Sequence, residues 1–267
     1  MSIKSESFDL NGCSFYAEIS GSGPYLVLLH GFGWDTRAWD DQFDEFAGGY
    51  TVVRYDLRGF GKSVPMNAAP YSHSRDLAAI LEHFHIQSAH ILGHSMGGYV
   101  AIDFALEYPD MTDSLMLADP AIGGFQWSDD LVDASFVIPP KLATTEGIEA
   151  GRRAWLEFPP FERAMSNRRL AARIVQMIEK YSGWHWFNPG LATQPETPAI
   201  QRLPEIACPT LVVVGGANHP DYLRSGQIIQ DGIWNARQVI IPGVEHALPL
   251  EAPHIFNESV LDFLKGI

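Results

Sequence analysis

The chain has 267 residues, of which 46% are hydrophobic and 19% charged, a composition typical of a globular protein and not of a disordered one. It carries 18 Lys and Arg against 32 Asp and Glu, and the net charge of −14 argues against nucleic acid and anionic membranes as partners. No apolar stretch reaches the roughly 18 residues of a membrane span. Residues 1–12 lack a signal-peptide core, and two cysteines make a disulfide framework unexpected, so we expect a cytoplasmic protein.

Short β-rich runs alternate with helical patterns along the first 118 residues. The chain opens with a predicted hairpin whose turn is the pair Asn11-Gly12. Apolar runs then predict strands, and apolar residues at helical spacing predict helices between them. The predicted strands are Ser7–Leu10, Ser14–Ile19, Tyr25–His30, Thr51–Asp56, Ala89–Leu92 and Leu115–Ala118, and the predicted helices are Ser74–Phe84 and Met96–Tyr108.

The pattern changes between residues 122 and 204, which hold no convincing strand but contain four tryptophans and two proline pairs. Strand-like runs return at Thr210–Val214 and Gln238–Ile241, and a final helix fits Ile255–Leu264. We therefore predict a core domain of residues 1–121 and 205–267, interrupted by a helical cap of residues 122–204. Alternating strands and helices imply a mostly parallel sheet, which binds ligands beyond the carboxyl ends of its strands.

A glycine-flanked serine follows the predicted strand Ala89–Leu92. Residues 93–97 read GHSMG, and G-x-S-x-G between a strand and a helix is typical of a nucleophile elbow. Larger side chains at positions 93 and 97 are expected to clash in such a sharp turn, and the following helix N-terminus favours negative charge. The alternative interpretation is an ordinary turn in which Ser95 caps the helix. The pattern favours Ser95 as a nucleophile.

A second glycine-containing loop, HGFG at residues 30–33, follows another buried strand. Such a loop can direct backbone N–H groups into a cleft. We expect the N–H groups of Phe32 and Met96 to form an oxyanion hole for a tetrahedral intermediate. By itself HGFG predicts only a tight turn with a structural histidine, but together with GHSMG it indicates acyl chemistry.

His246 is the candidate general base, because it lies on a loop after the last predicted strand. The chain has ten histidines, so any single one is more often a bystander. His94 is expected to point away from the serine hydroxyl. The histidines in helical or inserted segments are interpreted as bystanders, namely His73, His83, His85, His185 and His254.

These motifs resemble the α/β-hydrolase superfamily over essentially the whole chain. The matching stretches are HGFG (30–33), DLRGFGKS (56–63), GHSMGG (93–98), LVVVGG (211–216) and PGVEH (242–246). The resemblance implies a mostly parallel eight-stranded sheet flanked by helices, with a helical cap inserted after the sixth strand. It also implies Ser95 as nucleophile, His246 as base, and Phe32 and Met96 as oxyanion donors.

The acid behind the histidine is where this chain departs from the family. The family usually places an aspartate at the position of Asn218, and an amide cannot stabilise an imidazolium as a carboxylate does. Asp119, at the end of the sixth strand, is the favoured substitute, although it can also be read as a turn residue. Asp221 is the second candidate, with helix capping as its alternative, and the third possibility is that Asn218 itself takes the place of the acid or that no acid is present.

The inserted segment is rich in aromatic side chains, which suit an apolar or aromatic small-molecule substrate. We expect Trp127, Trp155 and Trp186 to bind it, and at least half of the aromatic residues only to pack the cap onto the sheet. The motifs predict a serine hydrolase of an ester, lactone or related acyl bond, needing no metal or organic cofactor, as a monomer or homodimer. Carbon–carbon bond hydrolysis, cofactor-free dioxygenation and a ligand-binding or regulatory role are the alternatives. The aromatic residues are Phe125, Trp127, Phe136, Trp155, Phe158, Phe161, Trp184, Trp186 and Phe187.

Overall fold

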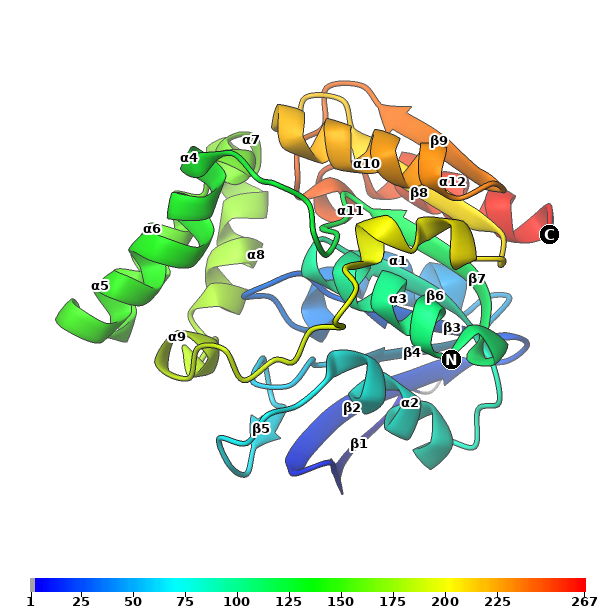
Figure 1. The fold of residues 1–267 in the computed structure, drawn as a ribbon, viewed down its shortest axis with the longest axis horizontal. Helices are drawn as coiled ribbons and strands as arrows, with labels where there is room; N and C mark the ends of the chain where they lie inside the picture. The colour runs from blue at the N-terminus through cyan, green and yellow to red at the C-terminus, as the bar shows by residue number, and fades with distance from the viewer. Residues whose placement is uncertain (1–2) are drawn as a thin grey trace.

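The computed structural model describes residues 3–267, which form one mixed β-sheet between two layers of helices, with further helices beyond one end of the sheet (Figure 1). The strand order is β1-β2-β4-β3-β6-β7-β8-β9, and β5 pairs with β2. The pairs that involve β2 are antiparallel, and all the other neighbouring strands are parallel. The strands are β1 (Lys4–Leu10), β2 (Cys13–Gly21), β3 (Tyr25–Leu29), β4 (Thr51–Tyr55), β5 (Val64–Pro65), β6 (Ala89–His94), β7 (Thr112–Ala118), β8 (Thr210–Gly215) and β9 (Ala236–Ile241).

The predicted strands are confirmed, with shifts of a few residues at their ends. The turn between β1 and β2 has Asn11 and Gly12 at φ values of 48° and 72°, the left-handed region that this residue pair adopts readily. The sheet has one more strand than the eight that the resemblance implies, because Val64 and Pro65 pair with β2. A strand of two residues is too short to produce a sequence pattern.

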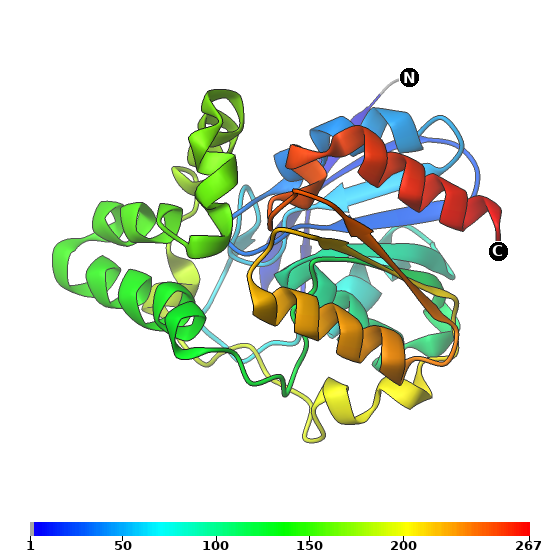
Figure 2. The same ribbon diagram turned by 90° about the horizontal axis from the view of Figure 1, so that it is seen from above.

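Two helical layers cover the faces of the sheet, and Figure 2 shows α10 and α12 on opposite sides of it. One layer contains α2, α3 and α10, and the other contains α1, α11 and α12. The parallel strands are buried between them, which explains their continuous apolar runs. The helices of these layers are α1 (Asp40–Phe46), α2 (His73–His83), α3 (Met96–Glu107), α10 (Pro220–Gly232), α11 (Leu248–Glu251) and α12 (Pro253–Lys265).

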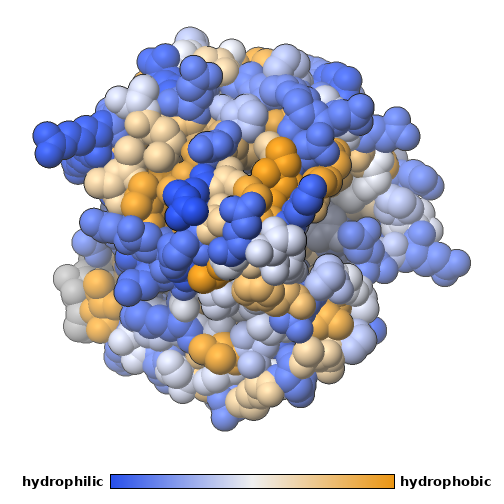
Figure 3. Space-filling view, turned by 90° about the vertical axis from the view of Figure 1, so that its left-hand side faces the viewer, coloured by the Kyte–Doolittle hydropathy of each residue, from blue (hydrophilic) through white to orange (hydrophobic). Residues whose placement is uncertain are grey.

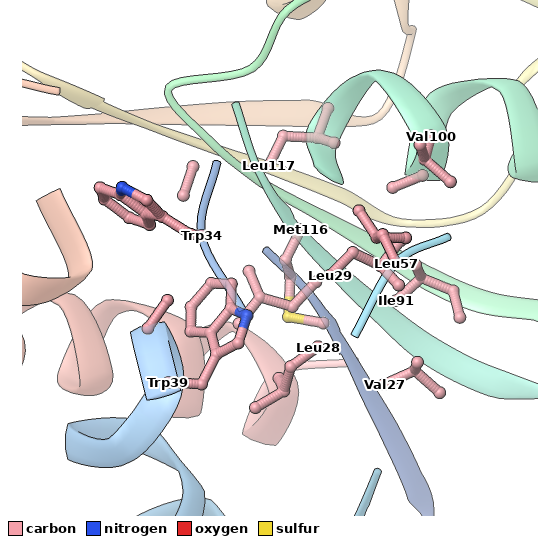
Figure 4. Packing of buried hydrophobic residues seen from close by; sticks show 14 of the residues in the cluster. Val27, Leu28, Leu29, Trp34, Trp39, Leu57, Ile91, Val100, Met116 and Leu117 are labelled. Atoms are coloured by element: carbon pink, nitrogen blue, oxygen red, sulfur yellow. The ribbon is translucent and has the colours of Figure 1, made fainter. Parts of the chain in front are cut away.

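The core of the sheet domain is centred on β3 and its neighbours (Figure 4). Val27, Leu28 and Leu29 on β3 are fully buried and belong to one cluster with Ile91 of β6 and Met116 of β7. This packing fixes the ends of β3, β6 and β7, where the sequence motifs lie.

The chain between β7 and β8 contains helices, 3-10 turns and one isolated bridge, and no β-strand in the described structure. Helices α4 to α9, residues 129–187, lie beyond one end of the sheet, and we call them the helical segment (Figure 1). Their helical character agrees with the expectation for residues 122–204, while the domain boundaries themselves stay a prediction. The helices are α4 (Asp129–Val132), a π-helical turn (Asp133–Val137), α5 (Ile138–Glu146), α6 (Ile148–Leu156), α7 (Glu162–Ser166), α8 (Arg168–Ile178) and α9 (Trp184–Phe187).

Short 3-10 helices complete the connections, and they are Thr36–Trp39, Pro109–Met111, Pro159–Phe161, Ala199–Gln201 and Leu203–Glu205. No helix within residues 3–267 combines the length and the apolar character needed to cross a membrane.

Candidate active site

Ser95 occupies a strained turn between β6 and α3. Its φ of 54° and ψ of −114° lie in a region that side-chain-bearing residues rarely adopt. Two glycines make room for the turn: a Cβ on Gly93 would lie 2.2 Å from the carbonyl oxygen of Gly97, and a Cβ on Gly97 would lie 2.1 Å from that of Leu29. The steric need for both glycines is therefore as expected.

The imidazole of His246 faces this serine. His246 Nε2 lies 2.9 Å from Ser95 Oγ, although 151 residues separate them along the chain. The side chain stands on the loop between β9 and α11, and the residue is only 2% exposed. Burial, and then the neighbouring His94, lower the pKa of His246 well below its usual range. The imidazole is therefore neutral at pH 7, as a general base must be.

His94 points away from the serine hydroxyl, as expected, and binds the loop that carries the base. Its Nε2–H donates a hydrogen bond to the carbonyl oxygen of His246 at 2.7 Å. Its ring stacks on Trp34 with centroids 4.7 Å apart, and burial lowers its pKa to about 4. A neutral His94 thus ties the elbow to the loop of His246.

The other imidazole nitrogen of His246 faces an amide. Asn218 Nδ2 lies 3.3 Å from His246 Nδ1, while Asn218 Oδ1 accepts a hydrogen bond from the backbone N–H of His219 at 2.8 Å. Because Oδ1 already has a donor, the amide presents its N–H to Nδ1, and the proton of the neutral imidazole is on Nε2. This tautomer donates toward Ser95, whereas the tautomer that accepts the serine proton carries its hydrogen on Nδ1.

Asp119 lies behind that amide at the end of β7. Its Oδ1 accepts a hydrogen bond from the N–H of Gly215 at 3.0 Å, and its Oδ2 has no hydrogen-bond partner among the described residues. Burial raises the pKa of Asp119 well above its usual range, and the hydrogen bond from Gly215 and the nearby Asn218 amide oppose this increase. Asn218 thus lies between the carboxyl group and the imidazole, and Asp119 makes no hydrogen bond to His246 within the described chain.

The second acid candidate, Asp221, is directed elsewhere. Its Oδ2 accepts a hydrogen bond from the N–H of Ser128 at 2.7 Å, and its Oδ1 pairs with Arg224 at 3.3 Å. The residue lies in the first turn of α10, whose N-cap is His219, so it is not the capping residue either. Asp221 connects α10 to the chain that leads into the helical segment.

Two backbone N–H groups near Ser95 have no acceptor. Within the described residues, neither Phe32 N–H nor Met96 N–H makes a hydrogen bond, and both residues line the same cavity as Ser95 and His246. The loop of Phe32 is held by His30, whose Nε2 accepts from the N–H of Leu57 at 2.9 Å. The two unpaired donors are available to an oxygen that develops negative charge.

A cavity of about 870 Å³ opens in front of these groups, between the sheet and the helical segment. All three tryptophans predicted to bind substrate line it: Trp127, Trp155 and Trp186. Seven of the nine aromatic residues singled out in the insertion line the cavity, and Trp184 and Phe187 do not. Four of the seven, Trp155, Phe158, Phe161 and Trp186, are at most 5% exposed and also pack in the core cluster, so the share that only packs stays a prediction.

Charges are sparse in the cavity. Among its lining residues in the described chain, Lys141 is the only lysine or arginine, and Asp103 and Glu107 are the only acids. Burial raises the pKa of Asp103 to about 6. Figure 3 shows the molecule from the side of the helical segment, where apolar groups interrupt a largely polar surface. A cavity with many aromatic and few charged lining residues suits an uncharged ligand.

Several lining residues were not identified from the sequence. Trp34 lies two positions after Phe32, and Tyr222 lies four positions after Asn218, so both follow motifs that the sequence analysis did single out. His73 and His185, interpreted as bystanders, also line the wall, but neither bonds to Ser95. Within residues 3–267, no group of three or more His, Cys, Asp or Glu side chains is arranged to hold a metal ion.

Comparison with known proteins identifies the same fold. A model of the alpha/beta hydrolase family matches residues 26–259. The 2-hydroxy-6-oxononadienedioate/2-hydroxy-6-oxononatrienedioate hydrolase of Cupriavidus pinatubonensis is 31% identical over 90% of this chain and 86% of its own. Among solved structures, the enol-lactonase from Burkholderia xenovorans LB400 has a TM-score of 0.84 at 24% identity, covering 97% of this chain and 100% of its own. Est816, described as an N-acyl homoserine lactone degrading enzyme, has a TM-score of 0.78 at 26% identity, covering 97% and 100%.

Proposed function

The chain belongs to the α/β-hydrolase family, and we propose that it is a serine hydrolase that cleaves an ester, lactone or related acyl bond through an acyl-enzyme. The observation that carries the proposal is the contact of 2.9 Å between His246 Nε2 and Ser95 Oγ at a strained elbow. His246 acts from the tautomer that carries its proton on Nδ1, for which the Asn218 side chain turns its Oδ1 toward that nitrogen. Nε2 then takes the proton of Ser95, Ser95 attacks the carbonyl carbon, and Phe32 and Met96 N–H bind the oxyanion. Water then hydrolyses the acyl-enzyme.

In this proposal Asp119 supplies the negative charge of the triad from behind Asn218. While His246 is neutral, a nearby carboxylate does not stabilise it. Proton transfer from Ser95 converts the imidazole into a positively charged imidazolium. A cation so close favours the ionised form of the buried Asp119 carboxyl, which in turn stabilises the cation. Because the amide of Asn218 lies between them, this stabilisation is weaker than a direct carboxylate–imidazole contact.

The substrate in this proposal is small, uncharged and hydrophobic or aromatic. A cavity of about 870 Å³ accommodates a drug-sized molecule, and Trp127, Trp155 and Trp186 offer aromatic surface to it. A dianionic substrate is disfavoured, because the described lining offers one lysine, Lys141, against two carboxyl groups. The helical segment serves as the cap that excludes water.

Carbon–carbon bond hydrolysis is the second candidate. The amide at His246 Nδ1, 3.3 Å away, favours this alternative, because it places the imidazole proton on Nε2, where it can be donated to a substrate carbonyl or carbanion. The relative from Cupriavidus pinatubonensis is named for a dienedioate substrate, which carries two carboxylates. The low positive charge of this cavity weighs against that particular substrate class.

Labelling with a fluorophosphonate probe tests the proposal. We expect the probe to modify Ser95, as identified by peptide mass spectrometry, and p-nitrophenyl esters of short acyl chains to be hydrolysed. Ser95→Ala should abolish both the label and about 10⁴-fold or more of kcat/KM, as expected for removal of a nucleophile. Ser259→Ala is the matched control, because Ser259 is a half-buried serine whose hydroxyl bonds to the carbonyl oxygen of Ile255 within α12. A probe that leaves Ser95 unmodified would refute the serine hydrolase proposal.

A further inference from the structure

Tyr222 stands beside the catalytic pair, and the reaction described above leaves it without a role. It is in the first turn of α10, and it is 6% exposed. Its ring lies against the imidazole of His246, with centroids 4.1 Å apart, and against Trp127, with centroids 4.9 Å apart. The aromatic neighbours on both sides hold the ring in one orientation.

The phenol of Tyr222 points toward the reacting atoms. Tyr222 lines the same cavity as Ser95 and His246, and the Ser95 hydroxyl lies near enough to the phenol to affect its pKa. His246 Nε2 lies 2.9 Å from Ser95 Oγ, and the Tyr222 ring packs against the same imidazole, so the phenol and the imidazole are both neighbours of the Ser95 side chain. A substrate acyl group on Ser95 places its leaving oxygen close to both.

The phenol keeps its proton throughout the physiological pH range. Burial, and then the charges of Asp119 and Asp221, raise the pKa of Tyr222, and the nearby Ser95 hydroxyl only partly opposes this. Tyr222 is therefore a neutral hydrogen-bond donor and not a base.

We propose that Tyr222 is a further catalytic residue, whose phenol O–H hydrogen-bonds the leaving oxygen of the substrate as the acyl-enzyme forms. The inference rests on the proposed serine hydrolase function. When the tetrahedral intermediate collapses, the bond between the carbonyl carbon and the leaving oxygen breaks, and the oxygen keeps the electron pair. The imidazolium of His246 transfers its Nε2 proton to that oxygen, while Tyr222 stabilises the developing charge and retains its own proton.

The inference predicts a dependence on the leaving group. Charge on the leaving oxygen is costly for an alcohol, which is a weak acid, and mild for p-nitrophenol, which is a much stronger acid. A donor aimed at that oxygen therefore matters more for alkyl esters. We expect Tyr222→Phe to lower kcat/KM for an ethyl ester by about 10-fold to 100-fold, and for the p-nitrophenyl ester of the same acid by less than about 3-fold.

The phenylalanine variant keeps both ring contacts, and its thermal melting curve should match that of the parent protein. Tyr99→Phe is the matched control, because Tyr99 lines the same cavity but its phenol lies next to Asp103, whose charge raises the pKa of the phenol after burial does. Any loss in this variant should be the same for both esters. As a second variant, 3-fluorotyrosine at position 222, a stronger hydrogen-bond donor, should leave the rate on the ethyl ester equal or higher.

Equal losses of Tyr222→Phe on the two esters would overturn the inference and give Tyr222 a packing role only, as would an unchanged ethyl ester rate. Fluorophosphonate labelling of Ser95 in the same variant separates this failure from failure of the proposed function. A labelled Ser95 without a leaving-group effect refutes the role of Tyr222 alone. An unlabelled Ser95 in the parent protein refutes the serine hydrolase itself.

Discussion

The turn at residues 93–97 and the turn at residues 215–222 perform the same architectural task in different ways. Each connects a buried parallel strand to a helix beside the cavity. In the first turn the backbone packs so closely that only glycine fits at positions 93 and 97. In the second, side chains decide the outcome, since Asn218 and Tyr222 face His246 and Asp221 turns away. A turn that depends on close backbone contacts can be predicted from its glycines. A turn that depends on the orientation of its side chains cannot be predicted from the sequence.

Of the changes that test this difference between the two turns, adding a methyl group at position 97 should have the largest effect, and it should act on the stability of the protein. The Cβ of Gly97→Ala would lie 2.1 Å from the backbone oxygen of Leu29, which cannot move without displacing β3. We expect the free energy of unfolding to fall by about 3 kcal/mol or more, measured by urea denaturation. Gly49→Ala, where a Cβ meets nothing within 4 Å, is the control and should change it by less than about 1 kcal/mol. Similar losses in both variants would contradict the steric account.

Changing the amide of the second turn to a carboxylate should have the next largest effect. Asn218→Asp places an acceptor at His246 Nδ1, so the imidazole proton moves to Nδ1 and Nε2 becomes free to accept from Ser95. We expect kcat on a p-nitrophenyl ester to rise by about 10-fold to 100-fold, a fraction of the roughly 10⁴-fold known for the reverse change in a serine protease.

Asp119→Asn and Asp221→Asn, each measured in the parent protein, test which carboxylate acts behind Asn218. Asp119→Asn should lower kcat by about 10-fold, the size expected for loss of one charge stabilising the imidazolium. Asp221→Asn should leave kcat within about 2-fold, because that carboxylate bonds to Ser128 and Arg224. Full activity of Asp119→Asn would contradict the role proposed for Asp119.

The smallest of the predicted effects is a shift in the pH dependence of kcat/KM. Because burial lowers the pKa of His246, the neutral base survives as the pH falls through 6.5, and activity is lost only at more acidic pH. The acid limb of kcat/KM should therefore lie below 6.5 in the parent protein. In Asn218→Asp a carboxylate next to the ring favours the imidazolium, so the limb should move upward by about one pH unit or more. An acid limb above 6.5 in the parent protein would contradict the lowered pKa.

Much of the fold could be predicted from the sequence because its evidence is local. The turn pair Asn11-Gly12, the apolar run of β3 and the helical spacing in α2 each reflect interactions within a few residues. The strand β5 was missed because it pairs only two residues. Its partners come from β2, about 50 positions earlier, so no local pattern records the contact.

The candidate site divides in the same way. Ser95, His246 and the N–H groups of Phe32 and Met96 follow from motifs and their order along the chain. The sequence shows that the insertion is rich in aromatic residues, but only the folded structure shows that seven of them line one cavity. The acid could not be chosen among Asp119, Asn218 and Asp221 from the sequence, since all three lie near strand or helix ends and differ only in where their side chains point.

The sequence by itself therefore determined the features that depend on local backbone structure. These are the glycines around Ser95, the buried strands and the change from strands to helices after β7. Side-chain directions were not determined in this way, and the folded chain settled them. Asn218 faces His246 Nδ1 because its Oδ1 is bound by the N–H of His219, and Asp119 stays behind it because Gly215 binds its Oδ1. The physical reason is range, since sterics act between near neighbours, whereas these hydrogen bonds join residues up to 96 positions apart.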